Sequence, residues 1–503
     1  MSRSCFLVAF LSVLAFGGSS AAAAPLLAGA AKVDITHPDH DAGDNPPFVK
    51  ALVLSDEASG TNAVLVAVDA VAIAEIGSIR DPYLAKVRKA LKAELGIEPG
   101  AVMVNASHCH ALVCAEVEAR TIEAVKTAWE NRVPVKIAAG VGHEDGISVN
   151  RRVRLKDGRE ADERHAYAMP PDEEIAAVGP IDPEIGLLRV DRADNGKPLA
   201  LVFQFSCHPI QGVPGGGNTA DLSGFAAKTI EEQLGDEAVA LFLQGCGGDI
   251  NPVLYKQVDR PRDARPLGIR LGLSALRGAR DLVPEAETEL ATVNESLRVP
   301  RANLSKRIGE MEQEIDALLA QLKGTSLNLE TFLPLIVKYG ISGETPSADA
   351  KRYLQDEALG REDWQHLDAQ NQRNIDAYLR NIQVMEELTR KQVNLALLEK
   401  HEARRIEAGE DSVEVEVAGL RVGDFRLVTF PGEVTVPIAL GLKERSPHDL
   451  TFISGYTNGY LYYAPTAEQL LNRGGAQEDS DCLLAPEWQA LFETKALEIL
   501  RGF

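Results

Sequence analysis

Cysteine is scarce in this sequence: the chain has six cysteines in 503 residues, and no two of them form a Cys-x-x-Cys pair. A zinc site built from thiolates uses such closely spaced pairs, so their absence argues against one. We expect the cysteines to be small buried residues that pack tight turns. Because five remain after Cys5, at least one thiol stays free or pairs between chains.

Several signature motifs of enzymes are also missing. The sequence has no Gly-x-Ser-x-Gly stretch, which argues against a serine hydrolase with that nucleophile elbow. It has no His-Glu-x-x-His stretch, so the common zincin arrangement is excluded. The glycine-rich segment 245–248 is not followed by Gly-Lys-Ser/Thr, so it is not a phosphate-binding loop of that type.

Positive charge is in deficit, since 52 lysines and arginines face 74 aspartates and glutamates, for a formal net charge of −22 at pH 7. Nucleic acid and anionic membrane surfaces repel such a chain, so we expect neither as a partner. After the first 25 residues, no apolar run is long enough to span a bilayer without charges. The expected partner is therefore a small molecule, and the sequence leaves the oligomeric state open.

The first residues, "MSRSCFLVAFLSVLAFGGSSAAAAP", combine one arginine, a short apolar run and a tail of small residues. This pattern is typical of a secretory signal peptide, and we assign it to residues 1–24, with cleavage near Ala24. The protein is then secreted or periplasmic. The mature chain, residues 25–503, is long enough for one large domain or two ordinary ones.

Apolar strands and amphipathic helices alternate over residues 27–285, which predicts an α/β fold. Residues 300–406 differ, because apolar residues recur there every three or four positions, as on one face of a helix. We predict a long, coiled-coil-like helical insertion that packs on the core and serves as scaffold rather than as a lid. The predicted fold class is thus a mixed β-sheet core flanked by helices, with this insertion.

Two histidines stand two apart in "VNASHCHALVCAE", where a predicted strand passes into a predicted helix. If the strand alternation continued, His108 and His110 would share one face, and two imidazoles converging on one point suggest a metal. The alternative is one solvated histidine and one bonded to backbone, and this stretch alone does not separate the two. In α/β proteins ligands bind at the carboxyl ends of the strands, which is where the pair is placed.

Other predicted strands also end in polar residues. "FQFSCHP" ends at His208, and Asp221 follows just before a helix, where it is either a site residue or an N-cap. "ALFLQGCGGDINP" carries Asp249 and Asn251 after glycines that allow a ligand to approach the backbone, or that simply make a tight turn. "LVTFPGEVT" places Glu433 at the start of a predicted helix, as a cap or as a ligand.

Four tyrosines lie between Tyr456 and Tyr463, in a chain that has ten. Clustered tyrosines either pack together or form a rim that hydrogen-bonds a substrate. Together, these segments supply two or three histidines, a glutamate and a phenol. That set is a plausible group of ligands for Zn²⁺ with room for water.

The order of the motifs "GAAKVDIT", "ASHCHAL", "NRR", "SCHP…TAD", "QGCGGDINP", "PGEVT" and "NGYLYYAPT" resembles the neutral/alkaline non-lysosomal ceramidase family. The resemblance extends from about Gly29 to Phe503, and the helical insertion is its least specific part. It implies a single catalytic domain over the mature chain, one zinc ion, and hydrolysis of the N-acyl amide of a sphingolipid or a similar lipid.

By position, the resemblance implies that the zinc ligands are His108, His208, Glu433 and Tyr463. It also implies that His110 lies near the metal as a polar partner of the substrate, and that Arg151 or Arg152 lines the pocket. We include Arg152, Asp249 and Asn251 with His110 among the candidate catalytic residues. Metal-activated water then attacks the carbonyl, and His110 or an arginine stabilises the oxyanion.

The sequence departs from the family pattern where the family has a serine and this chain has Asn251. An amide cannot replace a hydroxyl as a nucleophile. The family also carries a C-terminal β-sandwich domain that this sequence does not include. We therefore predict a secreted zinc hydrolase of an amide or ester, for which ceramide itself is a poor substrate.

Two alternatives remain open at this point. One is a zinc hydrolase of a polar substrate such as a carbohydrate ester. The other is a non-catalytic exported binding protein, which the retained ligand set argues against. A long apolar tunnel at the site would favour acyl chains, and a polar bowl would favour the polar substrate.

Export gives the first testable prediction. Signal peptidases cut after small residues at the end of an apolar segment, so the exported protein should begin at or near Pro25. N-terminal sequencing or the intact mass of the protein recovered outside the cytoplasm measures this directly. A mature protein that still carries Met1 would contradict it.

Overall fold

A computed structural model describes residues 26–503, apart from 163–169, 213–216, 236, 256, 258, 260–261, 287, 343–349 and 474. The signal peptide predicted at residues 1–24 lies outside the described residues. So does part of the glycine-rich loop that follows His208. In the part of the chain that the model describes, no helix has the length and apolar character needed to cross a membrane.

Eight strands form the main sheet, in which only the pairs β11–β12 and β3–β4 are parallel. The strands β10 and β11 pair antiparallel and form a hairpin. In spatial order the strands are β12 (Val239–Gln244), β11 (Pro198–Phe205), β10 (Glu184–Arg192), β5 (Val133–His143), β1 (Leu27–Asp34), β2 (Phe48–Asp56), β3 (Thr61–Val68) and β4 (Val102–Ala106).

A second, four-stranded sheet packs against the first. Its strands are β14 (Leu290–Pro300), β15 (Ser412–Val422), β16 (Phe425–Thr429) and β18 (Thr451–Ser454), and only β16 and β18 are parallel. Alternate residues of a strand face opposite sides. Leu52 and Leu54 of β2 therefore meet Leu420 and Phe452 of the second sheet, in one buried cluster. The intervening residues of β2 face helix α2.

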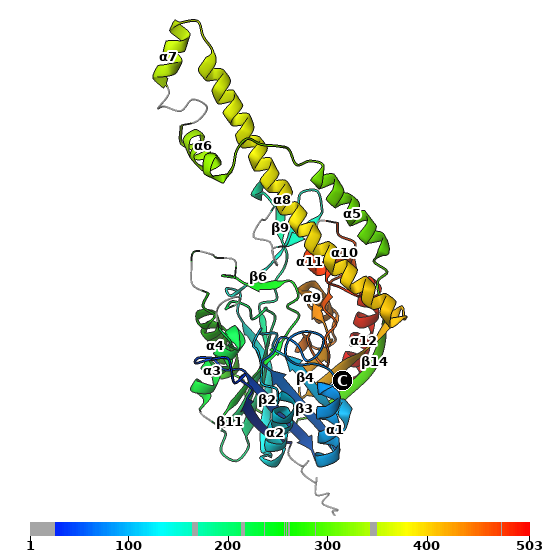
Figure 1. The fold of residues 1–503 in the computed structure, drawn as a ribbon. Helices are drawn as coiled ribbons and strands as arrows, with labels where there is room; N and C mark the ends of the chain where they lie inside the picture. Colours follow the sequence, from blue (N-terminus) through cyan, green and yellow to red (C-terminus); the bar gives the residue numbers. More distant parts are fainter. Residues whose placement is uncertain are drawn as a thin grey trace, which may run out of the picture.

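Helices cover the outer faces of both sheets. The helices α1 (Tyr83–Leu95) and α2 (Val117–Glu130) lie over one part of the main sheet, and α3 (Asp221–Leu234) and α4 (Arg265–Arg280) lie over β10 to β12. The helices α9 (Val436–Arg445) and α12 (Trp488–Gly502) pack on the second sheet (Figure 1). The predicted α/β fold with a mixed sheet flanked by helices is confirmed.

Short elements surround the loops between these layers. They form three small sheets, in the orders β13–β6, β17–β19 and β8–β7–β9. Their bounds are β6 (Ser148–Asn150), β7 (Arg152–Leu155), β8 (Glu160–Asp162), β9 (Ile175–Val178), β13 (Ile250–Pro252), β17 (Glu433–Val434) and β19 (Tyr463–Ala464), with the helices α10 (Ala467–Leu470) and α11 (Gln477–Ser480) and the 3₁₀ turns η1 (Pro99–Ala101) and η2 (Asp172–Glu174).

The predicted helical insertion is confirmed between the paired strands β14 and β15. It contains α5 (Ser305–Leu319), α6 (Leu329–Ser342), α7 (Ala350–Ala358) and the 46-residue helix α8 (Asp363–Ala408). The base of α8 packs on α5 through Met311, Ile315 and Leu398. The far end of α8 carries α6 and projects away from the sheets (Figure 1), so only part of the insertion packs on the core as the sequence predicted.

The main sheet bends back on itself. Its first and last strands, β12 and β4, contact each other, and the backbone amide of Gln244 donates to Asn105 Oδ1 over 2.8 Å. The sequence predicted a site at the edge of the sheet where the carboxyl ends of the strands lie together. In this mixed sheet β11 and β4 run in opposite directions, so their carboxyl ends do not share one edge. The curvature brings the ends of these two strands together instead.

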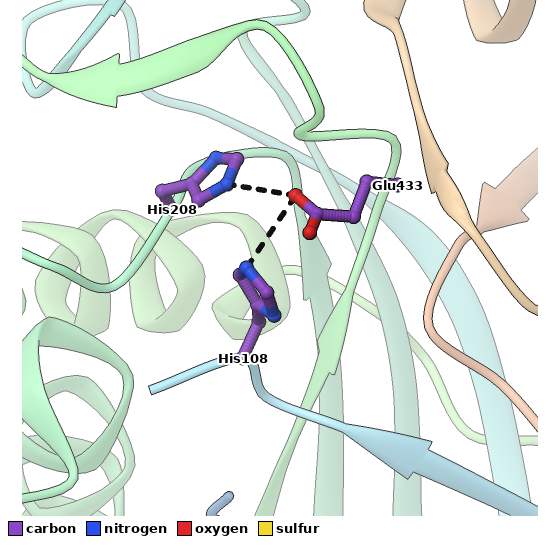
Figure 2. Close-up of side chains that lie close together, drawn as sticks. All are labelled: His108, His208 and Glu433. Carbon is purple, nitrogen blue, oxygen red and sulfur yellow. Dashed lines mark hydrogen bonds and ion pairs between the residues drawn. The ribbon is translucent and has the colours of Figure 1, made fainter. Parts of the chain in front are cut away.

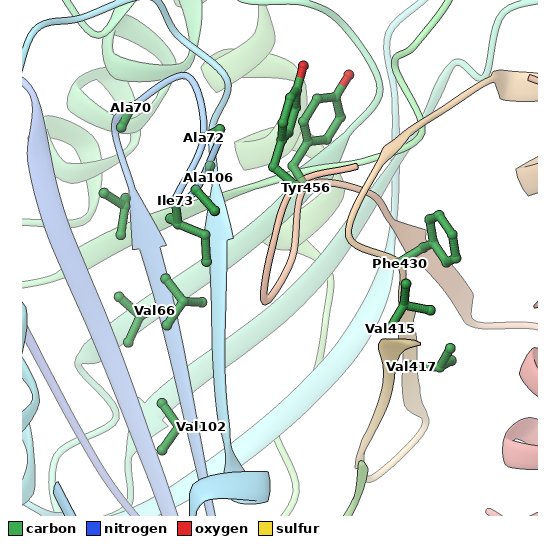
Figure 3. Close-up of a cluster of buried hydrophobic side chains, with 14 of the residues drawn as sticks. Val66, Ala70, Ala72, Ile73, Val102, Ala106, Val415, Val417, Phe430 and Tyr456 are labelled. Atoms are coloured by element: carbon green, nitrogen blue, oxygen red, sulfur yellow. The ribbon is translucent and has the colours of Figure 1, made fainter. Parts of the chain in front are cut away.

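The apolar core reaches the region where these strands end. One buried cluster contains Val66 of β3 and Val102 of β4, and it extends to Phe430 and Tyr456 in the loops beyond the second sheet (Figure 3). Tyr456 is 1% exposed. The loops that carry the candidate site are therefore anchored in the core of the protein.

Candidate metal site

Three buried side chains from distant parts of the sequence converge on one point. His108, His208 and Glu433 are each 2% exposed, and one ligand atom from each lies within 4.8 Å of the other two. The Nε2 atoms of His108 and His208 lie 3.4 and 3.0 Å from Glu433 Oε2 (Figure 2). Two imidazoles and a carboxylate are ligands that zinc accepts, so the group can hold a metal ion.

Hydrogen bonds to backbone carbonyls fix the orientation of both imidazoles. His108 Nδ1 lies 2.6 Å from Val71 O, and His208 Nδ1 lies 3.0 Å from Ile250 O. A carbonyl oxygen only accepts, so each Nδ1 carries the proton and each Nε2 presents a lone pair. In these tautomers the two lone pairs face the carboxylate oxygen of Glu433, and a cation between them removes the repulsion.

Both histidines are neutral at pH 7. Burial lowers the pKa of His108 to about 4, although the nearby charge of Glu433 opposes this. Burial, with the charge of Arg151, also lowers the pKa of His208. The neutral imidazole is the form that binds a metal, so the site is ready for one.

His108 occupies an unusual backbone conformation just beyond strand β4. The strand ends at Ala106, and His108 has φ of 66°, in the left-handed region that is sparsely populated outside glycine. Its amide donates to Ala70 O over 3.0 Å. The expected strand alternation of His108 and His110 is therefore wrong. His110 is exposed, and its ring centroid lies 5.6 Å from that of His108.

Glu433 and Tyr463 are brought together by a short parallel strand pair. They are register partners in β17–β19, so their side chains leave the pair on the same side. The sequence placed Glu433 in the first turn of a helix, but α9 begins at Val436. Tyr463 stacks beside His208, with ring centroids 6.5 Å apart. The structure thus places the fourth predicted ligand beside the other three.

Two further tyrosines hold the carboxylate of Glu433. The hydroxyl of Tyr460 donates to Glu433 Oε1, and that of Tyr456 donates to Oε2 over 3.3 Å. The loop that carries them is strained, with φ of 53° at Tyr456 and 60° at Tyr462. Sequence reasoning singled out the tyrosine cluster but did not assign these two to Glu433.

Arg151 is the arginine that contacts the site. Its guanidinium donates to Tyr463 Oη and to Asn251 Oδ1, each over 3.1 Å, and to Gly248 O over 2.6 Å. Its Nε bonds to Glu478 Oε1 at 2.6 Å, and both side chains are buried. No motif pointed to Glu478, which stands in the acidic run "QEDSD".

Arg152, the other candidate arginine, is surrounded by carboxylates. It forms ion pairs with Glu160, Glu478 and Asp479, at 2.6, 3.4 and 2.7 Å. Its charge is therefore held among carboxylates behind Arg151. Arg152 supports the site through Glu478, which both arginines share.

Asp249 holds the glycine-rich loop in place. Its carboxylate accepts from Asn150 Nδ2 over 2.9 Å and from the amide of Val436 over 2.8 Å. Burial raises the pKa of Asp249 to about 6. These bonds join the loop to β6 and to the start of α9, and Asn251 follows in strand β13, beside Arg151.

Two further sequence expectations can be compared with the structure. Asp221 is buried, and its carboxylate accepts from the amides of Gln211, Gly212 and Leu222, so it fixes residues 211–212, which follow His208. The cysteines from Cys109 onward are buried, as predicted, and all five are free.

The comparisons with known proteins support the fold. No family model matches the sequence, and no curated protein matches it. Among solved structures, the neutral ceramidase from Pseudomonas aeruginosa matches with a TM-score of 0.57 and 17% identity, over 95% of this chain and 74% of that chain. A ceramidase complexed with C2 matches with a TM-score of 0.58 and 17% identity, over 95% and 75%. The chain therefore has a neutral ceramidase-like fold, as the motifs predicted.

Gly248 offers a test of how the loop positions Glu433. A Cβ at Gly248 would lie 2.3 Å from Glu433 O, so Gly248→Ala must displace β17. We expect zinc affinity to fall by about 10–100-fold, the usual cost of disturbing the support of a metal ligand. Competition with a fluorescent zinc chelator measures this.

Gly309→Ala in α5 is the matched control, because a Cβ there meets nothing within 4 Å. It should leave zinc affinity unchanged and stabilise the helix by about 1 kcal/mol. If Gly248→Ala protein with a native circular dichroism spectrum bound zinc as tightly as the wild type, the loop would not position Glu433.

Proposed function

We propose that this protein is a zinc-dependent hydrolase that cleaves an amide (N-acyl) or ester bond. The observation that carries the proposal is the buried group of His108, His208 and Glu433, with both Nε2 atoms facing one carboxylate oxygen. The neutral ceramidase-like fold supports it. His108, His208 and Glu433 match the three protein ligands typical of catalytic zinc, and Tyr463 is proposed as a further ligand beside the position for water.

The residues around the group have distinct roles in this proposal. When bound, the cation supplies a Lewis acid that polarises a carbonyl and favours deprotonation of water. Tyr456 and Tyr460 orient Glu433, and Arg151 orients Tyr463. In this proposal His110, which is exposed beside His108, donates to the oxyanion of a bound substrate.

Water, rather than a side chain, is the proposed nucleophile. Asn251 stands where the ceramidase motif has a serine, and a carboxamide is not nucleophilic. The thiols in the described chain are buried. Burial raises the pKa of Cys207 and Cys246, which follow β11 and β12, so neither forms a thiolate at pH 7.

We also propose that the protein is exported, on the strength of the signal-peptide pattern in residues 1–24. Its partner is then a small-molecule or lipid-like amide or ester outside the cytoplasm. A polar ester is the second candidate substrate, and the acidic net charge of −22 favours a neutral or cationic molecule over an anionic surface.

Metal dependence is the central test. We expect one zinc per chain by elemental analysis, and removal of zinc by a chelator should abolish hydrolysis of N-acyl amides and acetyl esters. His108→Ala should lose the zinc and lower kcat by about 100–1,000-fold or more, because several kcal/mol of charge stabilisation disappear.

His143→Ala is the control for that variant. The His143 side chain is 67% exposed and pairs with Asp145, so its loss should change neither zinc content nor rate. A protein that hydrolyses these substrates equally well without metal would refute the zinc mechanism. A protein that holds zinc but cleaves no amide or ester would favour the binding-protein alternative.

Ceramide should be a poor substrate compared with smaller or more polar amides and esters. A serine hydroxyl both donates to and accepts from a substrate hydroxyl, whereas the Oδ1 of Asn251 is already occupied by Arg151. Rates with detergent-dispersed ceramide and with short N-acyl amides, at equal concentrations, check this. Faster cleavage of ceramide than of every polar amide or ester tested would overturn it.

A further inference from the structure

The side-chain amide of Asn251 is buried but only half satisfied. The residue is 1% exposed, and its Oδ1 accepts from Arg151 at 3.1 Å. Among the residues that the structure describes, its Nδ2 has no hydrogen-bond partner. A buried donor without a partner costs free energy, so in a native protein it calls for a partner such as a bound ligand, an ion or a water.

The orientation of this amide follows from its neighbour. A guanidinium offers only N–H donors, so the carbonyl end of Asn251 must face Arg151 and the NH₂ end must face away. Arg151 is itself fixed at both ends, by Glu478 and by Gly248 O, each at 2.6 Å. A flip of the amide would turn its NH₂ group toward the guanidinium and break the bond to Nη1, so Asn251 acts only as a donor on its free side.

Asn251 lies at the metal site. The carbonyl of the preceding residue, Ile250, accepts from the imidazole of His208 at 3.0 Å. On its other side, the guanidinium that holds Asn251 also donates to the hydroxyl of Tyr463. The residue before Asn251 thus bonds to one proposed zinc ligand, and Arg151 links Asn251 to another.

We propose that Asn251 Nδ2 donates a hydrogen bond to an acceptor oxygen, a carboxylate or a carbonyl, which the substrate carries beside the scissile bond. The inference rests on the proposed function for the identity of that bond. It assigns Asn251 the role of a specificity-determining residue. The protein therefore prefers a substrate whose oxygen beside the scissile bond can only accept a hydrogen bond. The same molecule without that oxygen is a poorer substrate.

A matched series of four amides tests the assignment in the zinc-loaded protein. N-hexanoylglycine carries a carboxylate, N-hexanoylglycinamide a carbonyl, N-hexanoylethanolamine a hydroxyl, and N-hexanoylethylamine no oxygen at that place. We expect kcat/KM for at least one of the first two to exceed that for the ethylamide by about ten-fold or more. The comparison between those two identifies which acceptor is recognised.

The variant Asn251→Asp changes the donor to an acceptor with almost no change of shape. Its carboxylate still pairs with Arg151, so the fold and the zinc content should persist. The ratio of kcat/KM for the acceptor substrate to kcat/KM for the ethylamide should fall to about one. Asn251→Ser should move the preference toward the ethanolamide.

Asn195→Asp is the charge-matched control. Asn195 is exposed in the turn between β10 and β11, so its substitution should leave all four rates unchanged. A uniform loss of rate over all four substrates in Asn251→Asp would indicate a structural role and overturn the proposal. An unchanged preference would overturn it as well.

Failure of the proposed function can be separated from failure of this inference. If none of the amides is hydrolysed, calorimetric binding of N-hexanoylglycine and N-hexanoylglycinamide to the zinc protein replaces the rates. Weaker binding of one of them to Asn251→Asp than to the wild type, with unchanged binding of the ethylamide, supports the donor role. Equal binding of all ligands to both proteins refutes it.

Discussion

A buried carboxylate, Glu433, is the group on which the arrangement of the site depends. An anion in the interior is costly unless charge or hydrogen bonds compensate it. Here two phenol hydroxyls donate to it, and the two imidazoles that face it present lone pairs rather than protons. A cation between the imidazoles and the carboxylate would compensate the charge further, which is why the donor set fits a metal.

The loops around Glu433 are built to hold that one position. Gly248 packs so closely on the backbone of Glu433 that no side chain fits there, and its amide donates to Val434 O over 2.9 Å. The strained backbone of the tyrosine loop turns Tyr456 and Tyr460 toward the carboxylate. Such strain persists because the surrounding core fixes the loop from several sides.

The helical insertion contributes to the same region through its base. His401 of α8 bonds to Asp481 at 2.8 Å, and the carbonyl of Asp481 accepts from the amide of Tyr463 over 3.1 Å. His401 also lies against Tyr462, with ring centroids 4.8 Å apart. The base of the insertion therefore supports the strand that carries the fourth proposed ligand, which agrees with the scaffold role expected from the sequence.

Local sequence patterns were sufficient to predict the helices and strands and the residue types of the site. The buried strands that precede His108 and His208 were visible as apolar runs, and the helical insertion was visible from its periodicity. The motif order also predicted the fold that the solved ceramidases share. These features depend on neighbouring residues in the chain, which is why one sequence shows them.

Contacts between segments far apart in the sequence decided the other features of the site. Glu433 looked like the start of a helix, but β19, thirty positions later, pairs with it and makes it a strand. Three further features depend on which side chains meet across the curved sheet. They are the choice between Arg151 and Arg152, the half-satisfied amide of Asn251 and the role of Glu478. The sequence determined the elements and the ligand types, because those follow from local periodicity and chemistry. Only the tertiary structure decided which of them converge, because that depends on packing between residues hundreds of positions apart.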